Sequence, residues 1–322
     1  MLHSFSLARF RFVLEPEDRL ALHPRNPGNT LRGAFGSTFK RLVCPTPHEC
    51  RETCRQKAIC PYGQIFEPSP PPASDRLSLN QDIPRPFVLR PPNGIETMAR
   101  PGDSLSFDLM LIGQALDYFP YFLVTFRELG DQGIGVGRGR YRIARVSMVN
   151  EDGIDVAEVY SGQDNIVRPS PFRITYKDCC RLAAERPLTQ SRCVTIRFLT
   201  PTLLKADGKI VERPEFHHVI KRLRDRLNAL AHFYCDDRLE MDYKSFGERA
   251  EAVRTMSCKL RWEDRDRRSW KTGVTHDMGG FVGEVTYEGD LEEFVPLLIL
   301  GQYTHVGKYA VWGNGRYEVM VL

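Results

Sequence analysis

A five-residue motif occurs twice in this chain, once in the middle and once near the end. Residues 137–141 read GRGRY and residues 313–317 read GNGRY, so four of the five positions are identical. Each copy follows an apolar segment that contains a proline and precedes a segment in which apolar and polar residues alternate, as in a strand. Because the match recurs in the same context, it indicates an internal duplication and two similar halves.

Each half predicts the order strand, helix, one or two strands, helix, glycine-rich loop and strand, from period-two alternation for strands and helical spacing for helices. The first half predicts strands and helices at 3–16, 29–43, 103–113, 115–130 and 140–149. The second half predicts them at 192–205, 213–234, 255–268, 279–290, 291–302 and 315–322. This order predicts an α+β protein of tandem ferredoxin-like (RRM-like, βαββαβ) domains. The expected domains are 1–185 and 186–322, with a cysteine-rich metal-binding insertion at about 44–100 in the first.

The charge and the apolar runs of the chain narrow the range of possible partners and locations. The 322 residues carry a formal net charge of +4, and basic residues cluster in the segments HHVIKRLRDRL and GVGRGRYRIAR. Such clusters suit a nucleic-acid partner. The first residues do not resemble a signal peptide, and no apolar run has the length of a membrane span. We therefore expect a cytoplasmic protein with reduced cysteines and no membrane contact.

Four of the nine cysteines lie close together. Cys44, Cys50, Cys54 and Cys60 have the spacing C-x5-C-x3-C-x5-C. In a reducing compartment, four such thiolates predict a structural Zn²⁺ site, whose role would be to fold an insertion with little core of its own. An iron–sulfur cluster uses the same ligands and is a second interpretation, and cysteines without a metal are a third. His48 could replace one of the cysteines.

Glycines surround both copies of the repeated motif. Gly307, Gly313 and Gly315 lie in the second copy's loop, and glycine-rich loops can present backbone N–H groups to phosphates. Cationic side chains stand among the glycines of both loops: Arg138, Arg140, Lys308 and Arg316. The alternative is a tight turn that packs a helix on a sheet without a ligand. A dinucleotide site fits poorly, because these glycines precede a strand and do not open a helix.

Four segments in order along the chain resemble one known family. They are GNTLRGAFGSTFKRLVC, CPYGQIFEP, IRFLTPTLLK and LGQYTHVGKYAVWGNGRYEV. Together they resemble the RAMP superfamily of prokaryotic CRISPR systems, and most closely its pre-crRNA-processing endoribonucleases. The resemblance implies tandem ferredoxin-like domains that bind CRISPR repeat RNA and cut it once without a catalytic metal. It also implies crRNA and CRISPR effector subunits as partners, and the cysteine cluster would mark a subgroup.

Metal-free RNA cleavage uses the substrate's 2′-OH as the nucleophile and leaves a 2′,3′-cyclic phosphate and a 5′-OH. The protein must orient the phosphate, transfer protons and stabilise negative charge. His305 lies between Tyr303 and Lys308, which is a base beside a cation, although it could instead contact RNA without proton transfer or hold the loop. His23 competes for the catalytic role, because the resemblance implies a histidine on or near the first helix.

Cations on two predicted helices complete the expected RNA-binding set. They are Arg32 and Lys40 on the first helix and Lys221 and Arg224 on the long helix of the second half. Their phosphate contacts would make the affinity fall with salt, although charge runs on helices are also typical of solvated faces. Two other functions stay open: a RAMP subunit that holds crRNA without cutting it, and a small-molecule enzyme.

Overall fold

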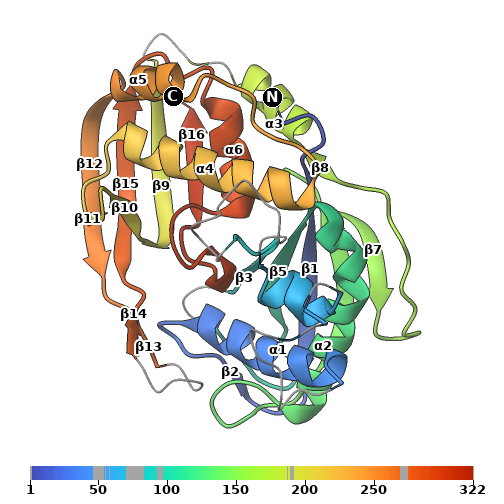
Figure 1. Ribbon diagram of the computed structural model, residues 1–322. Helices are drawn as coiled ribbons and strands as arrows, with labels where there is room; N and C mark the ends of the chain where they lie inside the picture. The colour runs from blue at the N-terminus through green and yellow to red at the C-terminus, as the bar shows by residue number, and fades with distance from the viewer. Residues whose placement is uncertain are drawn as a thin grey trace. The chain divides into compact units, whose positions relative to one another are not determined.

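The computed structural model describes residues 2–45, 54, 56–57, 59–69, 83–92, 97–186, 188, 192–268 and 275–321 (Figure 1). The chain forms two compact units, one of Leu7–Arg173 and one of Met1–Ser6 with Ile174–Leu322. The boundary therefore comes earlier than the predicted 185/186. Helix α3 (Tyr176–Glu185) belongs to the C-terminal unit because it packs against α6 (Val295–Thr304).

The N-terminal unit is built on an antiparallel sheet with the strand order β3-β5-β1-β6-β7. Its strands are β1 (Ser6–Pro16), β3 (Phe87–Arg90), β5 (Leu105–Ile112), β6 (Tyr141–Val149) and β7 (Asp155–Ser161). Its helices are α1 (Pro27–Val43) and α2 (Phe119–Gln132). Shorter elements are β2 (Leu20–Ala21), η1 (Tyr62–Phe66), β4 (Met98–Ala99) and η3 (Gly113–Tyr118).

Helix α1 begins at a strong sequence signal. The Asn26 side chain accepts a hydrogen bond from the Asn29 N–H at 3.2 Å, and a proline follows Asn26 at the first helical position. The buried side of α1 then packs on α2, with the rings of Phe35 and Phe122 stacked at 4.7 Å between centroids. Burying such aromatic pairs is a large hydrophobic gain, so tertiary packing stabilises both helices.

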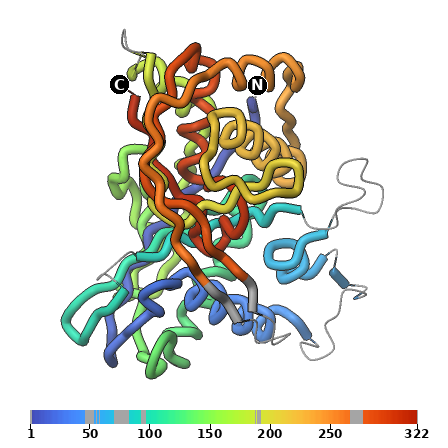
Figure 2. Tube along the Cα trace, turned by 90° about the vertical axis from the view of Figure 1, so that its left-hand side faces the viewer, coloured from blue at the N-terminus to red at the C-terminus, as the bar shows by residue number. Residues whose placement is uncertain are grey.

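The C-terminal unit has an antiparallel sheet with the order β12-β15-β9-β16, and α4 and α6 lie over one face of it (Figure 1). The strands are β9 (Cys193–Thr202), β12 (Arg254–Glu263), β15 (Gly280–Glu288) and β16 (Tyr317–Val321). The other elements are β8 (Ile174–Thr175), β10 (Leu204–Ala206), β11 (Lys209–Val211), α4 (Phe216–Tyr234), α5 (Tyr243–Glu251), β13 (Asp266–Arg268), β14 (Thr275–Asp277) and η4 (Ala310–Trp312). Strands β12 and β15 run side by side into the β13–β14 hairpin (Figure 2).

Both units have the order strand, helix, two strands, helix and strand, which was predicted in full for the C-terminal unit and without β3 for the N-terminal unit. The first and third of these strands are central in each sheet, β1 with β5 and β9 with β15. Each copy of the repeated motif ends on an equivalent tyrosine, which begins the last strand. The Tyr141 hydroxyl donates to the Phe126 carbonyl and the Tyr317 hydroxyl to the Leu298 carbonyl, both at 2.8 Å and both on the preceding helix. The duplication therefore extends to a matching tertiary hydrogen bond.

The predicted insertion needs one correction. Phe87–Arg90, which the sequence places inside the irregular stretch 44–100, is strand β3 and pairs with β5. Prolines on both sides of this short segment hide its strand pattern in the sequence. Among the helices that the structure describes, none is both long and apolar enough to cross a lipid bilayer.

Candidate nucleic-acid interface

The loop between α6 and β16 is held by backbone hydrogen bonds within the C-terminal unit. The Val306 N–H donates to the Gly315 carbonyl at 3.0 Å, the Lys308 N–H to the Leu203 carbonyl at 3.1 Å and the Gly315 N–H to the Pro201 carbonyl at 3.0 Å. These N–H groups therefore bind protein carbonyls and are not bare donors for a phosphate.

The glycines of this loop satisfy backbone geometry. Gly307, Gly313 and Gly315 have φ angles of 81°, 85° and 69°, a region that favours glycine. A Cβ on Gly315 would overlap the carbonyl oxygen of Val306. This geometry favours the tight-turn interpretation for the backbone, and the predicted RNA contact of the three glycines stays a prediction.

His305 is part of the loop's internal structure. Its side chain is 0% exposed, and its Nδ1 lies 3.0 Å from the Asn314 carbonyl oxygen. The Asn314 side chain in turn donates to the Met278 carbonyl at 3.2 Å. Tyr303 is also buried, at 5% exposure, whereas Lys308 is exposed. Of the predicted catalytic group in this loop, Lys308 is the side chain placed to meet a ligand.

His23 has a different setting, in the turn before α1. It is exposed, and its Nδ1 accepts a hydrogen bond from the Asn26 N–H at 3.2 Å. Its own N–H donates to the Thr30 hydroxyl at 3.3 Å. Because Nδ1 accepts a hydrogen bond, the neutral ring carries its proton on Nε2. His23 is thus an oriented imidazole that a ligand can reach.

The glycine-rich loop of the N-terminal unit presents two of the predicted cations. Arg138 is exposed and has a φ of 52°. Arg140 is exposed too, but its Nε lies 2.9 Å from a carboxylate oxygen of Asp18. Hydrogen bonds from Arg140 lower the pKa of Asp18. Arg138 is therefore better placed than Arg140 to meet an anionic ligand.

The cations of α1 pack on aromatic rings within their own unit. Arg32 is only 7% exposed, and its Cζ lies 4.3 Å from the centre of the Phe66 ring. Lys40 is half-buried, with its Nζ 5.7 Å from the Tyr62 ring centre. Both rings belong to η1, which sequence patterns did not predict. The expectation that Arg32 faces RNA is therefore corrected: it contributes a cation–π contact to the core.

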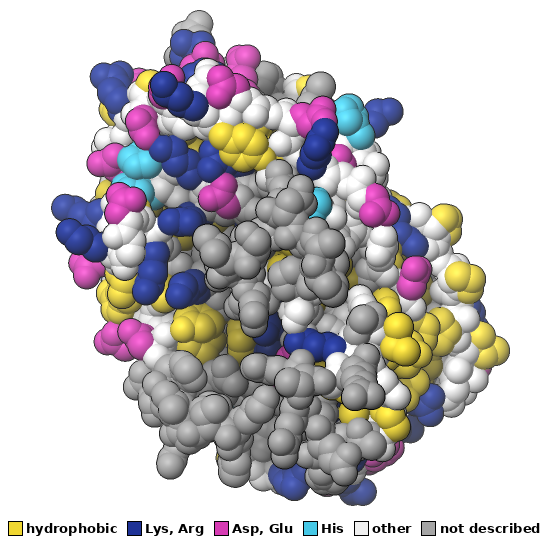
Figure 3. Space-filling model, in the orientation of Figure 1, with side chains coloured by type: hydrophobic (Ala, Val, Ile, Leu, Met, Phe, Trp, Pro, Cys, Tyr) yellow, Lys and Arg dark blue, Asp and Glu magenta, His cyan; other side chains and the backbone are white. Residues whose placement is uncertain are grey.

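The predicted cations of α4 also have partners. Lys221 is paired with Glu251, and Arg224 has an ion pair with Asp225 at 2.7 Å and lies 4.8 Å from the Tyr243 ring centre. Glu251 and Tyr243 belong to α5, a helix that sequence analysis missed. Its start was visible as Asp242, whose side chain caps the helix. Other Lys and Arg side chains gather on this face around α4 (Figure 3).

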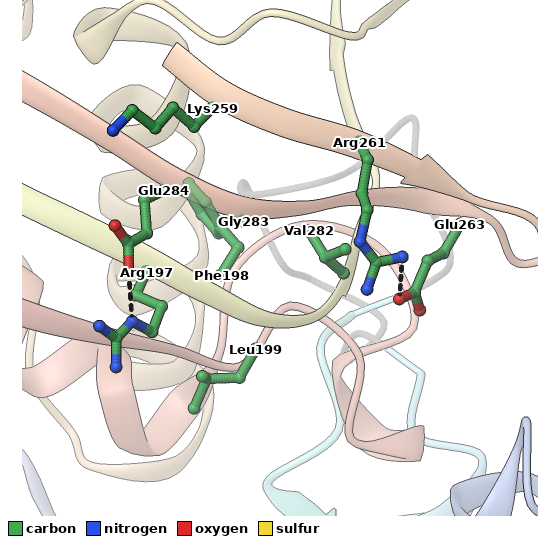
Figure 4. Close-up of a pocket in the computed structure, with 9 residues that line it drawn as sticks. All are labelled: Arg197, Phe198, Leu199, Lys259, Arg261, Glu263, Val282, Gly283 and Glu284. Carbon is green, nitrogen blue, oxygen red and sulfur yellow. Dashed lines mark hydrogen bonds and ion pairs between the residues drawn. The ribbon is translucent and has the colours of Figure 1, made fainter. Parts of the chain in front are cut away.

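A basic groove on the sheet of the C-terminal unit was not predicted. It has a volume of about 400 Å³ and lies on β9, β15 and β12 (Figure 4). Arg197 is paired with Glu284 and Arg261 with Glu263, both at 2.6 Å, while Lys259 is exposed. Charged residues at alternate positions of β12 were the available signal, because alternate residues of a strand share a face.

The cysteine cluster lies partly outside the described residues. Cys44 is buried and Cys54 and Cys60 are half-buried, all as free thiols, whereas Cys50 and His48 are not described. Within the described ranges, the one set of side chains that could jointly hold a metal ion contains no cysteine. The three described cysteines therefore do not form a zinc site by themselves.

Two family models match the chain. Residues 5–172 match the AF_1859_N N-terminal domain, and residues 196–317 match the CRISPR-associated endoribonuclease Cas6. The chain belongs to the family of the AF_1859_N N-terminal domain, whose model matches more than half of it, and its C-terminal unit is similar to Cas6 endoribonucleases. The second match runs from β9 to the start of β16 and includes the complete glycine loop. A comparison with curated proteins finds no match.

Solved Cas6 structures have the same fold. A product complex of a Thermus thermophilus Cas6 matches with a TM-score of 0.56 at 19% identity, over 98% of this chain and 99% of that one. A second structure of the same Thermus thermophilus Cas6 matches with a TM-score of 0.55 at 17% identity, over 98% of this chain and 99% of that one. A partial Cas6-RT-Cas1–Cas2 complex matches at 0.60 and 13%, over 99% of this chain and 47% of that one. At these identities the likeness shows the shared two-domain α+β fold.

Proposed function

We propose that this protein is a Cas6-type, metal-independent endoribonuclease that binds CRISPR repeat RNA and cleaves precursor crRNA. The observation that carries the proposal is the match of residues 196–317 to the Cas6 endoribonuclease model. The matched region includes the glycine-rich loop, in which the N–H groups of Val306, Lys308 and Gly315 are hydrogen-bonded to backbone carbonyls. Tandem ferredoxin-like domains and the exposed cations Lys308 and Arg138 support an RNA substrate.

The proposed reaction is attack of a substrate 2′-OH on the adjacent phosphate. The new P–O bond forms as the bond to the 5′-oxygen breaks, which gives a 2′,3′-cyclic phosphate and a 5′-OH. One proton leaves the 2′-OH and one is supplied to the 5′-oxygen, so general acid–base groups suffice. We assign one proton transfer to His23 of the N-terminal unit. We assign a phosphate contact along the RNA to Lys308 of the C-terminal unit. His305 and Tyr303 then hold the loop that carries Lys308.

The function is tested with purified protein and repeat RNA in EDTA. A single cut that leaves a cyclic phosphate is the expected result. Tight binding with intact RNA would instead support the alternative, a RAMP subunit that holds crRNA in an effector complex. If the protein neither cleaves nor binds the repeat RNA, both functions are rejected and a small-molecule enzyme becomes the favoured interpretation.

Lys308→Ala is expected to reduce the salt dependence of RNA binding. Loss of one phosphate contact reduces the magnitude of the negative slope of log affinity against log salt by about 1, and it weakens binding to all RNA sequences similarly. Arg32→Ala is the contrasting variant, because this buried side chain should affect stability and leave the slope unchanged. Filter binding at several salt concentrations measures both. An unchanged slope in Lys308→Ala would remove Lys308 from the interface.

Partners and location follow from the same proposal. The Cas6-RT-Cas1–Cas2 assembly contains a chain of this fold, which supports association of this protein with other CRISPR proteins. Because its proposed substrate is a CRISPR transcript, we also propose that the protein acts in the prokaryotic cytoplasm.

We further propose that the four cysteines bind a structural Zn²⁺ ion. One of them, Cys50, lies outside the described residues. Elemental analysis would show zinc in the purified protein that a Cys54→Ser variant loses if the four thiolates bind it, or iron if they hold a cluster.

A further inference from the structure

Two histidines and a glutamate meet at the start of α4. One potential ligand atom from each of Glu215, His217 and His218 lies within 4.8 Å of the others. The rings of His217 and His218 are 4.0 Å apart between centroids, and the His217 Nδ1 is 3.4 Å from a Glu215 carboxylate oxygen. Glu215 is 67% exposed at its side chain, so an ion can reach the group from solvent. Figure 3 shows histidine side chains at the surface over this end of α4.

The donor set selects a class of metal. Imidazole nitrogens suit first-row transition ions such as Zn²⁺, Co²⁺, Ni²⁺ and Cu²⁺, whereas Mg²⁺ and Ca²⁺ prefer sets made of oxygen. A histidine binds a metal ion as the neutral imidazole, and both His217 and His218 can supply one. Asp207 also acts electrostatically on His218 and adds negative charge nearby.

Three features of the structure disfavour a cation at this site, and each has a small effect on its binding. The N-terminal end of a helix favours anions, but this effect is weak at an exposed site. Lys221 is close by, but it is paired with Glu251. The Glu215 N–H donates to the His218 Nδ1 at 3.1 Å. Coordination by His218 gives up this bond, either because Nδ1 binds the metal or because Nε2 does and its proton moves to Nδ1. One neutral hydrogen bond is weak beside a metal–imidazole bond.

We propose that Glu215, His217 and His218 form a binding site for a divalent transition metal ion of the Zn²⁺ class. Three protein ligands leave the remaining coordination positions to water. The ion links the segment before α4 to the first turn of that helix and stabilises it by binding the folded state. The site is independent of the proposed ribonuclease function, because it uses neither His23 nor Lys308.

Titration of the intact protein with Co²⁺ tests the site, because the absorption spectrum reports the ligands. We expect one equivalent of Co²⁺ to bind without the charge-transfer band of thiolate ligands, which separates this site from the cysteine cluster. His217→Ala should lower the affinity at least about tenfold, since even loss of an outer hydrogen-bond partner costs about 10–100-fold. His232→Ala is the matched control, from the last turn of the same helix, and should bind like the unmodified protein.

Glu215→Gln is a second variant that keeps the size of the side chain. It should also lower the Co²⁺ affinity, and Zn²⁺ should displace Co²⁺ from the unmodified protein and raise its melting temperature. Circular dichroism of each variant without metal checks that α4 is intact, and Glu215→Gln decides the question if His217→Ala misfolds. Unchanged Co²⁺ affinity in both variants, or a thiolate band that accounts for all bound Co²⁺, would overturn the proposal.

Discussion

Replacing His23 with alanine is expected to lower the rate of repeat-RNA cleavage by about 10²–10⁴-fold, the usual contribution of one general acid–base group. His23 is exposed, and the Asn26 N–H holds its ring through Nδ1. RNA affinity should change little, because the proton is transferred only in the reaction. Single-turnover cleavage with the variant in excess, together with a binding titration, separates the rate from the affinity.

His232→Ala serves as the control for this variant, since it removes another histidine far along α4 and should cut at the normal rate. His305→Ala should behave differently from both. It removes a buried ring bonded to the Asn314 carbonyl, so its loss of rate should accompany a lower melting temperature. Normal cleavage by His23→Ala would remove this histidine from the reaction.

Replacing Gly315 with alanine is expected to lower the free energy of unfolding of the C-terminal unit by about 2–5 kcal/mol. The residue's φ of 69° is left-handed, which costs other residues about 1–2 kcal/mol. The added Cβ would also overlap the Val306 carbonyl, and the backbone shift that relieves such crowding costs about 1–3 kcal/mol more. The same backbone shift should weaken the hydrogen bond from the Val306 N–H to the Gly315 carbonyl.

Gly208→Ala is the matched control in the same unit. Gly208 has a φ of 78° in the β10–β11 turn, but a Cβ there would meet nothing within 4 Å. This variant should therefore show only the strain of about 1–2 kcal/mol. Urea unfolding followed by tryptophan fluorescence compares the two variants. The fluorescence reports on the C-terminal unit, because all three tryptophans of the chain belong to it, at positions 262, 270 and 312. Equal losses in both variants would contradict the close packing at Gly315.

Local patterns predict most of the fold because the elements are strongly periodic and repeated. The elements η1 and α3 were missed. Two further exceptions are β3, a four-residue strand between prolines, and the helix α5, whose polar sequence has few apolar residues to set a period. Both depend on tertiary contacts more than on local preference. Once β1, β5 and β6 are aligned, β3 has an edge to pair with, and no local signal reports that edge.

Side-chain roles were harder to predict than elements. Residue type and spacing made His305 and Lys308 look equivalent as site residues, but His305 is buried by contacts with Asn314 while Lys308 is exposed. Arg32 has the helical position of a surface cation, but the η1 segment brings the Phe66 ring against it. Burial depends on which distant segments return to the loop or helix. Sequence can therefore nominate such residues, and only the fold separates those in the core from those at the surface.

The most direct test of the cleavage mechanism uses one atom of the substrate. The cut is first mapped with all-ribose repeat RNA in EDTA, and the same RNA is then made with a 2′-deoxy nucleotide on the 5′ side of that bond. We expect that the substituted RNA binds and stays intact, while the all-ribose RNA gives a 2′,3′-cyclic phosphate and a 5′-OH. Cleavage of the substituted RNA at the same bond would contradict attack by the 2′-OH.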